Sequence, residues 1–391
     1  MMPRVKIALS HLRHAHAGGT ERHLNQLAQF LAEQGHDVTI LCRTHESAPH
    51  PRVRFEVLRS PVLGAVWRAK AFAAAVDRHV REHRYDLVYG LGRTWSQDVL
   101  RLGGGAHATY LELAHEATRV GWKRWLAPFE LKRAAWLELE RRAFGAPSLR
   151  RVVVNARMVQ DDIMRRYGLP EERFELIYNG VDTERFHPAK RAAGGAALRR
   201  ALGLAPDALV ALFLGSGYGR KGLDGVLRAF ASARERSAHI VVVGYDSAQA
   251  LFETQARELG LADRTHFLGG RRDAEDCFAL ADLYLLPTRY DPFANTTLEA
   301  LATGLPVLTT RTNGAHELLT EGREGSILPA PEDTAAWTAA LDRWLDRTRL
   351  EPASRAARAL AEQHSAASKM RQSLAMLERV LAEKRAATTR A

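Results

Sequence analysis

Short apolar runs alternate along most of this chain with longer segments in which apolar residues recur every three or four positions. The first pattern predicts buried strands and the second predicts amphipathic helices. Strands are predicted, for example, over 37–41, 151–155 and 239–243, and helices over 65–82 and 248–259. A β-α-β rhythm of this kind is typical of a parallel sheet covered by helices, so the predicted fold class is α/β.

The rhythm runs twice. The first series closes on a strand over 174–178 that leads into Asn-Gly-Val-Asp at 179–182, and the second opens with a strand over 209–214. Asn-Gly is a strong turn signal, and the polar, glycine-containing stretch 187–200 is typical of a linker. The predicted parts are a Rossmann-like domain over 1–180, a second over 181–370, and a helical tail over 371–391 that packs back toward the N-terminal domain.

Two glycine-rich turns lie where a predicted strand passes into a helix. Gly18 and Gly19 follow the first strand, and Gly215 opens the sequence Gly-Ser-Gly-Tyr-Gly-Arg-Lys-Gly in the second half. Glycine permits the close approach of a ligand, and amides at a helix start bind phosphate oxygens. Arg220 and Lys221 add two positive charges suited to a diphosphate. For Gly18 and Gly19, a plain strand-to-helix turn stays open as the alternative.

Two carboxylates flank a third turn, between a strand predicted at 284–286 and a helix predicted from about residue 295 to Gly304. Asp291 lies in the loop and Glu299 in the helix, with seven residues between them. Backbone N–H groups at the helix start are predicted to be free to bind an anion. They belong to Phe293, Ala294, Asn295 and Thr296. The two acids can accept hydrogen bonds from hydroxyls at two ends of one ligand, such as a sugar nucleotide; a solvated helix face is the alternative for Glu299.

The second glycine loop departs from other phosphate-binding motifs. Arg220 stands where a dinucleotide-binding loop has its third glycine, and Gly222 follows Lys221 where a P-loop has Ser or Thr. The chain has no Asp-x-Asp sequence, and its two cysteines, Cys42 and Cys277, are far apart. We therefore expect no metal and no cofactor.

At 391 residues the chain can form two domains, and its net charge of +11 favours an anionic partner. The partner classes are nucleic acid, a membrane surface or a phosphorylated substrate. Basic residues gather at the phosphate loop and in one Trp-rich segment, without a nucleic-acid module, so no nucleic-acid partner is expected. No apolar run approaches the roughly 18 residues that cross a bilayer, and we expect a protein that is neither secreted nor membrane-spanning.

The Trp-rich segment covers 113–144 and interleaves aromatic with basic residues. Docking on an anionic membrane is predicted, with rings at the interface and cations toward headgroups. The residues expected to meet the membrane are Trp122, Lys123, Arg124, Trp125, Lys132 and Arg133. Pro128 divides the segment into two helical pieces. The alternative is a helix whose Trp face packs in the core and whose basic face is solvated.

Taken together, these motifs resemble the retaining nucleotide-sugar glycosyltransferases of family 4, which have the GT-B fold of two Rossmann-like domains facing across a cleft. The likeness rests on the acidic-seven-acidic spacing, the Gly-Gly-x-Glu-Arg run at 18–22, Asn-Gly-Val-Asp at 179–182, Gly-Arg-Lys-Gly at 219–222 and the segment 267–271. It covers nearly the whole chain and is strongest toward the lipopolysaccharide core glucosyltransferase I group.

The resemblance implies donor-binding roles. The first acid, here Asp291 in place of the usual Glu, contacts the donor sugar, and Glu299 holds the ribose. Amides of Gly18 and Gly19 face the diphosphate, and Arg271 helps to hold the base.

It also implies a histidine against donor sugar and acceptor, for which His107 is the candidate, although a lone histidine is often structural. Arg220 and Lys221 are expected to stabilise the charge that develops as the glycosidic C–O bond breaks. The expected catalytic set is His107, Arg220, Lys221 and Asp291.

The function implied is metal-independent transfer of a hexose, expected to be glucose, from a UDP-sugar to a saccharide hydroxyl of a glycolipid in lipopolysaccharide core assembly. Such an enzyme is expected in the cytoplasm, peripherally bound to the inner face of the cytoplasmic membrane. The alternatives are another family 4 transferase with a different nucleotide sugar or acceptor, and a nucleotide-sugar epimerase of the same fold.

Overall fold

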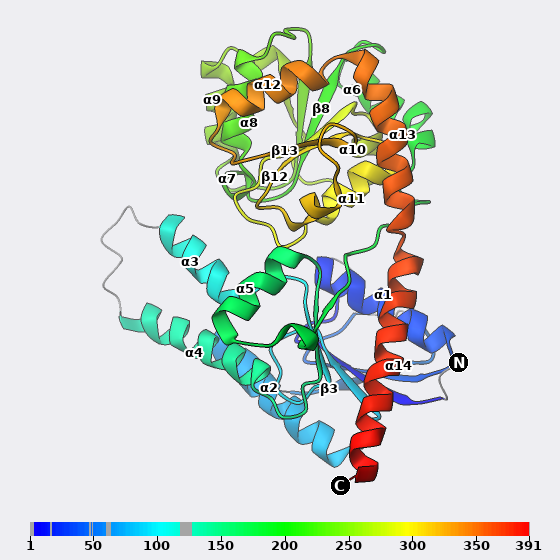
Figure 1. Ribbon diagram of the computed structural model, residues 1–391. Helices are drawn as coiled ribbons and strands as arrows, with labels where there is room; N and C mark the ends of the chain where they lie inside the picture. Colours follow the sequence, from blue (N-terminus) through cyan, green and yellow to red (C-terminus); the bar gives the residue numbers. More distant parts are fainter. Residues whose placement is uncertain are drawn as a thin grey trace. The chain divides into compact units, whose positions relative to one another are not determined.

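The computed structural model describes residues 4–15, 18–46, 48, 50–59, 64–117 and 127–390 (Figure 1). Contacts between Cα atoms divide the chain into two compact units. The N-terminal unit comprises Met1–Ile177 and Met370–Ala391, and the C-terminal unit comprises Tyr178–Lys369. Within the described ranges, no helix has the length and apolar character that a bilayer span requires.

The N-terminal unit contains a sheet of seven strands within its described part, in the order β3-β2-β1-β4-β5-β6-β7. All neighbouring pairs in this sheet run parallel. The strands are β1 (Lys6–Ser10), β2 (Asp37–Cys42), β3 (Val53–Val57), β4 (Leu87–Gly90), β5 (Val99–Leu102), β6 (Arg151–Val154) and β7 (Phe174–Leu176). The central strands β4 and β5 are buried throughout, as expected for a parallel sheet covered on both faces.

Helices cover both faces of this sheet. They are α1 (Gly19–Glu33), α2 (Ala65–Glu82), α3 (His107–Ala117), α4 (Ala127–Phe144), α5 (Arg157–Tyr167), the 3-10 turn η2 (Glu171–Arg173) and α14 (Ala366–Arg390). Leu27 of α1 and Leu377 of α14 join Leu9 of β1 in one buried cluster. Val76 of α2 packs with Ala8, which points to the opposite face. The C-terminal helix α14 therefore completes the core of the N-terminal unit (Figure 1).

The C-terminal unit repeats the architecture with six strands in its described part, ordered β10-β9-β8-β11-β12-β13 and all parallel. They are β8 (Val210–Leu214), β9 (His239–Val243), β10 (Thr265–Phe267), β11 (Leu283–Leu286), β12 (Val307–Thr310) and β13 (Gly325–Leu328). Chain order reverses between β8 and β11. Open α/β sheets bind their ligands beyond the carboxyl ends of the strands at such a switch point.

The helices of this unit also lie on both faces of its sheet. They are η3 (Pro188–Ala192), α6 (Gly194–Ala201), α7 (Tyr218–Lys221), α8 (Leu223–Ser232), α9 (Gln249–Glu258), η4 (Ala262–Arg264), α10 (Ala274–Ala279), α11 (Asn295–Ala302), η5 (Gly314–Leu318), α12 (Thr334–Trp344) and α13 (Arg347–Gln363). Phe230 of α8 and Trp337 of α12 pack with Phe213 in one core cluster. On the other face, the ring of Phe278 in α10 lies 5.4 Å from that of Tyr284.

The prediction of a linker over 187–200 is wrong. This stretch forms η3 and α6 within the C-terminal unit. Its glycines serve close packing instead of flexibility. A Cβ on Gly194 would lie 2.0 Å from an oxygen of Asp276, and one on Gly195 would lie 2.5 Å from the Ala279 carbonyl oxygen. Arg199 is buried and donates to Asp282 at 2.8 Å. This segment is therefore part of the fold of the unit.

Candidate active site

The second glycine-rich turn connects β8 to α7 at the switch point of the C-terminal unit. Gly217 and Gly222 both adopt a φ of 77°, which favours glycine. A Cβ on Gly222 would lie 2.0 Å from the carbonyl oxygen of Pro287. Glycine at 222 therefore allows this turn to approach the loop that follows β11.

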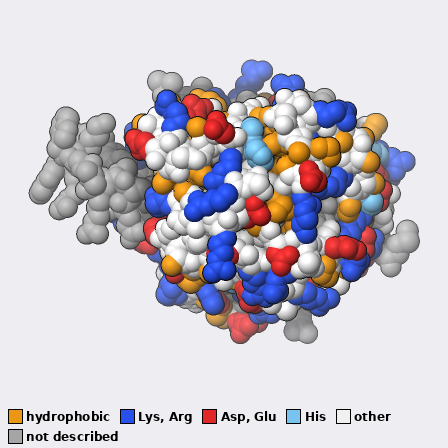
Figure 2. Space-filling view, turned by 90° about the horizontal axis from the view of Figure 1, so that it is seen from above, with side chains coloured by type: hydrophobic (Ala, Val, Ile, Leu, Met, Phe, Trp, Pro, Cys, Tyr) orange, Lys and Arg blue, Asp and Glu red, His pale blue; other side chains and the backbone are white. Residues whose placement is uncertain are grey.

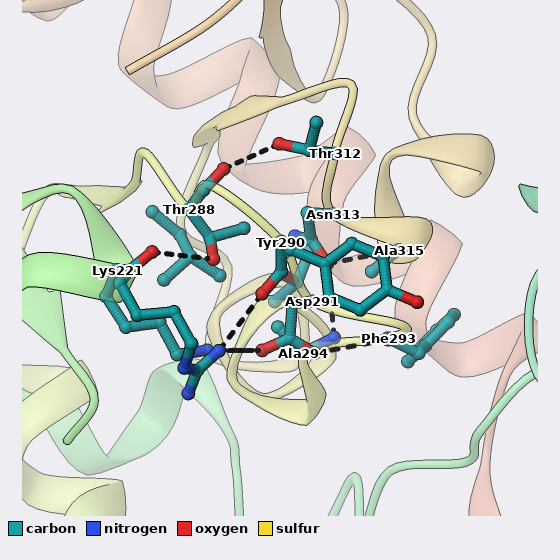
Figure 3. A network of polar contacts seen from close by, with 12 residues as sticks. Lys221, Thr288, Tyr290, Asp291, Phe293, Ala294, Thr312, Asn313 and Ala315 are labelled. Atoms are coloured by element: carbon teal, nitrogen blue, oxygen red, sulfur yellow. Dashed lines mark hydrogen bonds and ion pairs between the residues drawn. The ribbon is translucent and has the colours of Figure 1, made fainter. Parts of the chain in front are cut away.

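That close approach brings together three residues predicted to be catalytic. The Nζ of Lys221 lies 2.5 Å from Asp291 Oδ2, and Arg220 Nη1 lies 3.6 Å from the same oxygen. Figure 3 shows the side chains of Lys221 and Asp291 pointing toward each other. Burial lowers the pKa of Lys221, whereas the Asp291 carboxylate opposes that change. Two cations thus meet one carboxylate where amides can receive a diphosphate.

Arg289 braces the glycine loop and was missed by the sequence analysis. Its guanidinium donates to the carbonyl oxygen of Gly219. It donates as well to both carboxylate oxygens of Asp224, at 3.1 Å to each oxygen. It also forms an ion pair with Glu332 at 2.8 Å. Because Arg289 precedes Asp291 by two residues, these contacts tie the acid-bearing loop to the phosphate loop. The isolated arginine in the sequence carried no signal of this role.

The start of α11 offers fewer free amides than predicted. The Phe293 amide donates to Asp291 Oδ1 at 3.2 Å, and the Ala294 amide donates to Asn313 Oδ1 at 3.1 Å. The expectation that all four amides are free is therefore wrong for these two. Asn295 and Thr296 follow as the first residues of the helix, and the Asn295 side chain accepts a hydrogen bond from Asn179 at 2.6 Å.

The remaining donor-site candidates of this unit lie at the same edge of the sheet. Glu299 is on α11 and only 7% exposed, which disfavours the alternative of a solvated helix face. Arg271 follows β10, two strands from β8, and forms a bidentate pair with Asp273 at 2.9 and 2.5 Å. Arg271 therefore has an acidic partner of its own and is not drawn into the Lys221–Asp291 cluster. A base-binding role for Arg271 stays a prediction.

In the N-terminal unit, Gly18 directly precedes α1 and Gly19 is its first residue, again at the switch point of the sheet. Gly18 has a φ of 110°, and a Cβ there would lie 2.2 Å from Glu21 Oε2. His11 Nδ1 lies 3.2 Å from the Leu91 carbonyl oxygen, to which it can only donate, and Nε2 faces Glu21 Oε1 at 3.8 Å. His11 and Glu21 are polar groups beside the glycine turn that the sequence analysis did not assign.

His107 begins α3 just after β5. Its amide donates to Glu140 Oε1 at 2.7 Å, so the buried Glu140 caps this helix. The imidazole packs against Trp136, with ring centroids 4.8 Å apart. Burial, together with the nearby Arg93 cation, lowers the pKa of His107 to about 4. A neutral imidazole at pH 7 can accept a hydrogen bond from a substrate hydroxyl, but it is a poor proton donor.

The predicted membrane segment is described only in part. Trp122, Lys123, Arg124 and Trp125 lie outside the described residues. On α4, Lys132 is exposed and Arg133 is half-buried. Trp136, one turn further along, packs inside the unit against His107 and under the Arg93 guanidinium. The alternative of a tryptophan packed into the fold therefore holds for Trp136.

Two family models match this chain. Glycosyltransferase Family 4 matches residues 17–185, and Glycosyl transferases group 1 matches residues 208–347. The two matches together take in most of both units. The chain is a glycosyltransferase of family 4. The resemblance seen in the sequence, the predicted enzyme class and the GT-B fold class are confirmed.

Relatives of this glycosyltransferase include the lipopolysaccharide glucosyltransferase WaaG of Escherichia coli, 28% identical over 319 residues, which cover 80% of this chain and 82% of WaaG. The D-inositol 3-phosphate glycosyltransferase of Saccharomonospora viridis is 29% identical over 364 residues, covering 84% and 81% of the two chains. A crystal structure of WaaG has the same fold, with a TM-score of 0.77 at 24% identity over 94% of this chain and 98% of that one. Anabaena HepE in complex with UDP-glucose gives a TM-score of 0.72 at 19% identity, covering 96% and 99% of the chains.

Proposed function

We propose that this glycosyltransferase transfers glucose from UDP-glucose to a saccharide hydroxyl of a glycolipid during lipopolysaccharide core assembly. The observation that carries the donor half of the proposal is the cluster of Lys221, Arg220 and Asp291 at the switch point of the C-terminal unit. Cations at a glycine turn suit a diphosphate, and the carboxylate suits sugar hydroxyls. HepE, which has the same fold, binds UDP-glucose, and this supports UDP-glucose as the donor.

In this reaction the bond between the anomeric carbon and the phosphate oxygen breaks. A bond from the anomeric carbon to the acceptor oxygen forms, and the hydroxyl proton is released. The leaving UDP gains negative charge, which Lys221 and Arg220 stabilise without a metal ion. Among the described residues, no three His, Cys, Asp or Glu side chains gather into a metal-binding group. Asp291 orients the sugar, and Glu299 accepts hydrogen bonds from the ribose.

The acceptor half of the proposal is supported by WaaG, which is named a lipopolysaccharide glucosyltransferase and is similar over 80% of this chain. The competing acceptor is D-inositol 3-phosphate, the substrate named for relatives of comparable identity. Incubating the protein with radiolabelled UDP-glucose separates the two. The proposal predicts label in a core-truncated lipopolysaccharide and none in D-inositol 3-phosphate. Label in the inositol phosphate, or a converted UDP-sugar formed without acceptor, contradicts it.

We further propose that the Trp-rich segment holds the enzyme on the inner face of the cytoplasmic membrane, near its glycolipid acceptor. Lys132 is exposed on α4, and Leu131 beside it is 70% exposed, which suits an interfacial position. Elsewhere, Lys and Arg side chains are spread in separate groups with acidic side chains between them on the face in Figure 2. On this face, the distribution does not favour a nucleic-acid partner.

Liposome co-sedimentation tests the membrane proposal. Binding should rise with anionic lipid, fall with salt, and drop when Lys123, Arg124, Lys132 and Arg133 are replaced by Gln, since each cation contributes roughly 1 kcal/mol near an anionic surface. The matched control replaces four exposed arginines of the C-terminal unit by Gln. This control variant should bind anionic vesicles as the wild type does. Equal binding to neutral and anionic vesicles contradicts docking through this segment.

A further inference from the structure

Asn313 is fully buried at the start of η5, on the loop that follows β12. Its side-chain oxygen accepts hydrogen bonds from the amides of Ala294, at 3.1 Å, and Ala315, at 3.2 Å. Its side-chain nitrogen donates to the hydroxyls of Thr297 and Thr309, each at 3.0 Å. Both hydrogens and both lone pairs of this amide are therefore used.

These contacts fix the orientation of the amide. A flipped Asn313 would turn its NH₂ group toward two amide donors, so the oxygen must face Ala294 and Ala315. Thr309 donates its own hydroxyl proton to the Leu286 carbonyl oxygen at 2.9 Å, so it can only accept from Asn313. The sequence around Asn313 reads as an ordinary polar turn, whereas the side chain has one defined role in space.

The backbone beside Asn313 holds Asp291 from both sides. The Asp291 amide donates to the Thr312 carbonyl oxygen, and the Gly314 amide donates to the Asp291 carbonyl oxygen, both at 2.9 Å. Figure 3 shows Asn313 next to Ala294 and Asp291, on the side away from Lys221. The loop after β12 is thus hydrogen-bonded to the loop after β11 at Asp291 and at Ala294, the residue before α11.

We propose that Asn313 is a positioning residue for glycosyl transfer, which holds Asp291 and the first turn of α11 in the geometry that receives the donor sugar. The inference rests on the proposed role of Asp291 as the sugar-binding acid. Asn313 itself is buried and acts through Ala294 and the Asp291 loop. A displacement of about 1 Å in such a group can cost ~10²-fold in rate.

The test compares Asn313→Ala with Thr309→Val. Asn313→Ala frees the Ala294 amide, whereas Thr309→Val removes hydrogen bonds from the same buried cluster but leaves the link from Asn313 to Ala294 intact. Calorimetry should show that Asn313→Ala weakens UDP-glucose binding roughly 10-fold while UDP affinity stays within about threefold. Both variants should have a lower melting temperature than the wild type, because both lose buried hydrogen bonds. Thr309→Val should nevertheless leave the ratio of the UDP-glucose and UDP affinities unchanged. Equal changes of this ratio in both variants would overturn the proposal.

A double-mutant cycle with Asp291→Asn separates positioning from a structural contribution. If Asn313 acts through Asp291, the double variant should be within about twofold of Asp291→Asn alone in kcat/KM, because coupled residues are not additive. Losses that multiply would show that Asn313 acts elsewhere. If Asp291→Asn alone leaves UDP-glucose affinity unchanged, the proposed role of Asp291 fails first, and the inference fails with it. Should Asn313→Ala not fold, Asn313→Ser is judged by the same affinity ratio.

Discussion

Replacing Lys221 by Met tests the charge-stabilising role on which the donor site depends. The Lys221 side chain is only 9% exposed and contacts Asp291 at 2.5 Å, so its charge is fixed in place before the donor binds. Loss of one preorganised donor to a developing anion costs about 2.7–4 kcal/mol, or 10²- to 10³-fold in turnover. Arg220, 3.6 Å from the same carboxylate oxygen, retains one positive charge in the variant. We therefore expect a loss of about 10²-fold.

The stability of this variant should change much less than its activity. Met removes the desolvation cost that lowers the pKa of Lys221, and Arg220, 3.6 Å from Asp291 Oδ2, still pairs with the carboxylate that loses Lys221. Lys384→Met is the matched control, because Lys384 pairs with the buried Asp98 at 2.9 Å in the N-terminal unit. Its melting temperature should fall while turnover stays near that of the wild type. Initial rates at saturating donor decide the matter, and a folded Lys221→Met enzyme within threefold of wild-type turnover would refute the reasoning.

Four further outcomes are expected. Glu299→Ala should weaken UDP and UDP-glucose binding alike in calorimetry, whereas Asp291→Asn should weaken UDP-glucose alone; equal losses of UDP affinity in both would contradict the assignment. Activity should be unchanged by EDTA, and loss that Mg²⁺ restores would disprove metal-independent transfer. Gly222→Ala should lower the melting temperature more than Gly203→Ala, because both have positive φ but only the first adds a carbon 2.0 Å from a carbonyl oxygen. The pKa of His107 is lowered to about 4 from the ordinary 6.5, so the unfolded chain binds the proton more readily than the folded chain. The stability of the folded protein should therefore fall as the pH falls from about 6.5 to 4. The melting temperature of His107→Asn should fall less than that of the wild type over this window.

The pattern of apolar residues predicted much of the fold because each parallel strand is a separate apolar run. The helix expected over 65–82 and the strand expected over 239–243 have these bounds in the structure. The strands β3, β5 and β13 were missed, although Val-Arg-Phe-Glu-Val of β3 alternates apolar and polar residues as a strand does. The sequence Val-Leu-Arg-Leu of β5 is short and interrupted by a buried arginine, and β13 begins at Gly325, so neither gives a clear strand pattern.

The residues of the donor site were predictable as motifs, but their contacts were not. Asp291 and Lys221 are 70 residues apart in the chain, and only the adjacency of β8 and β11 brings them together. Asn313 reaches the start of α11 by the same kind of adjacency, between β11 and β12. Gly194 misled the linker prediction because glycine permits flexibility and tight packing alike, and the sequence does not distinguish them.

The most direct test of the central claim is a crystal structure of the protein with UDP-glucose bound. The account predicts that the diphosphate lies against the glycine turn at 215–217, with Lys221 Nζ and an Arg220 nitrogen within hydrogen-bond distance of its oxygens, and that Asp291 contacts the glucose. A nucleotide bound anywhere else, or a bound donor with its diphosphate out of reach of Lys221 and Arg220, would contradict it.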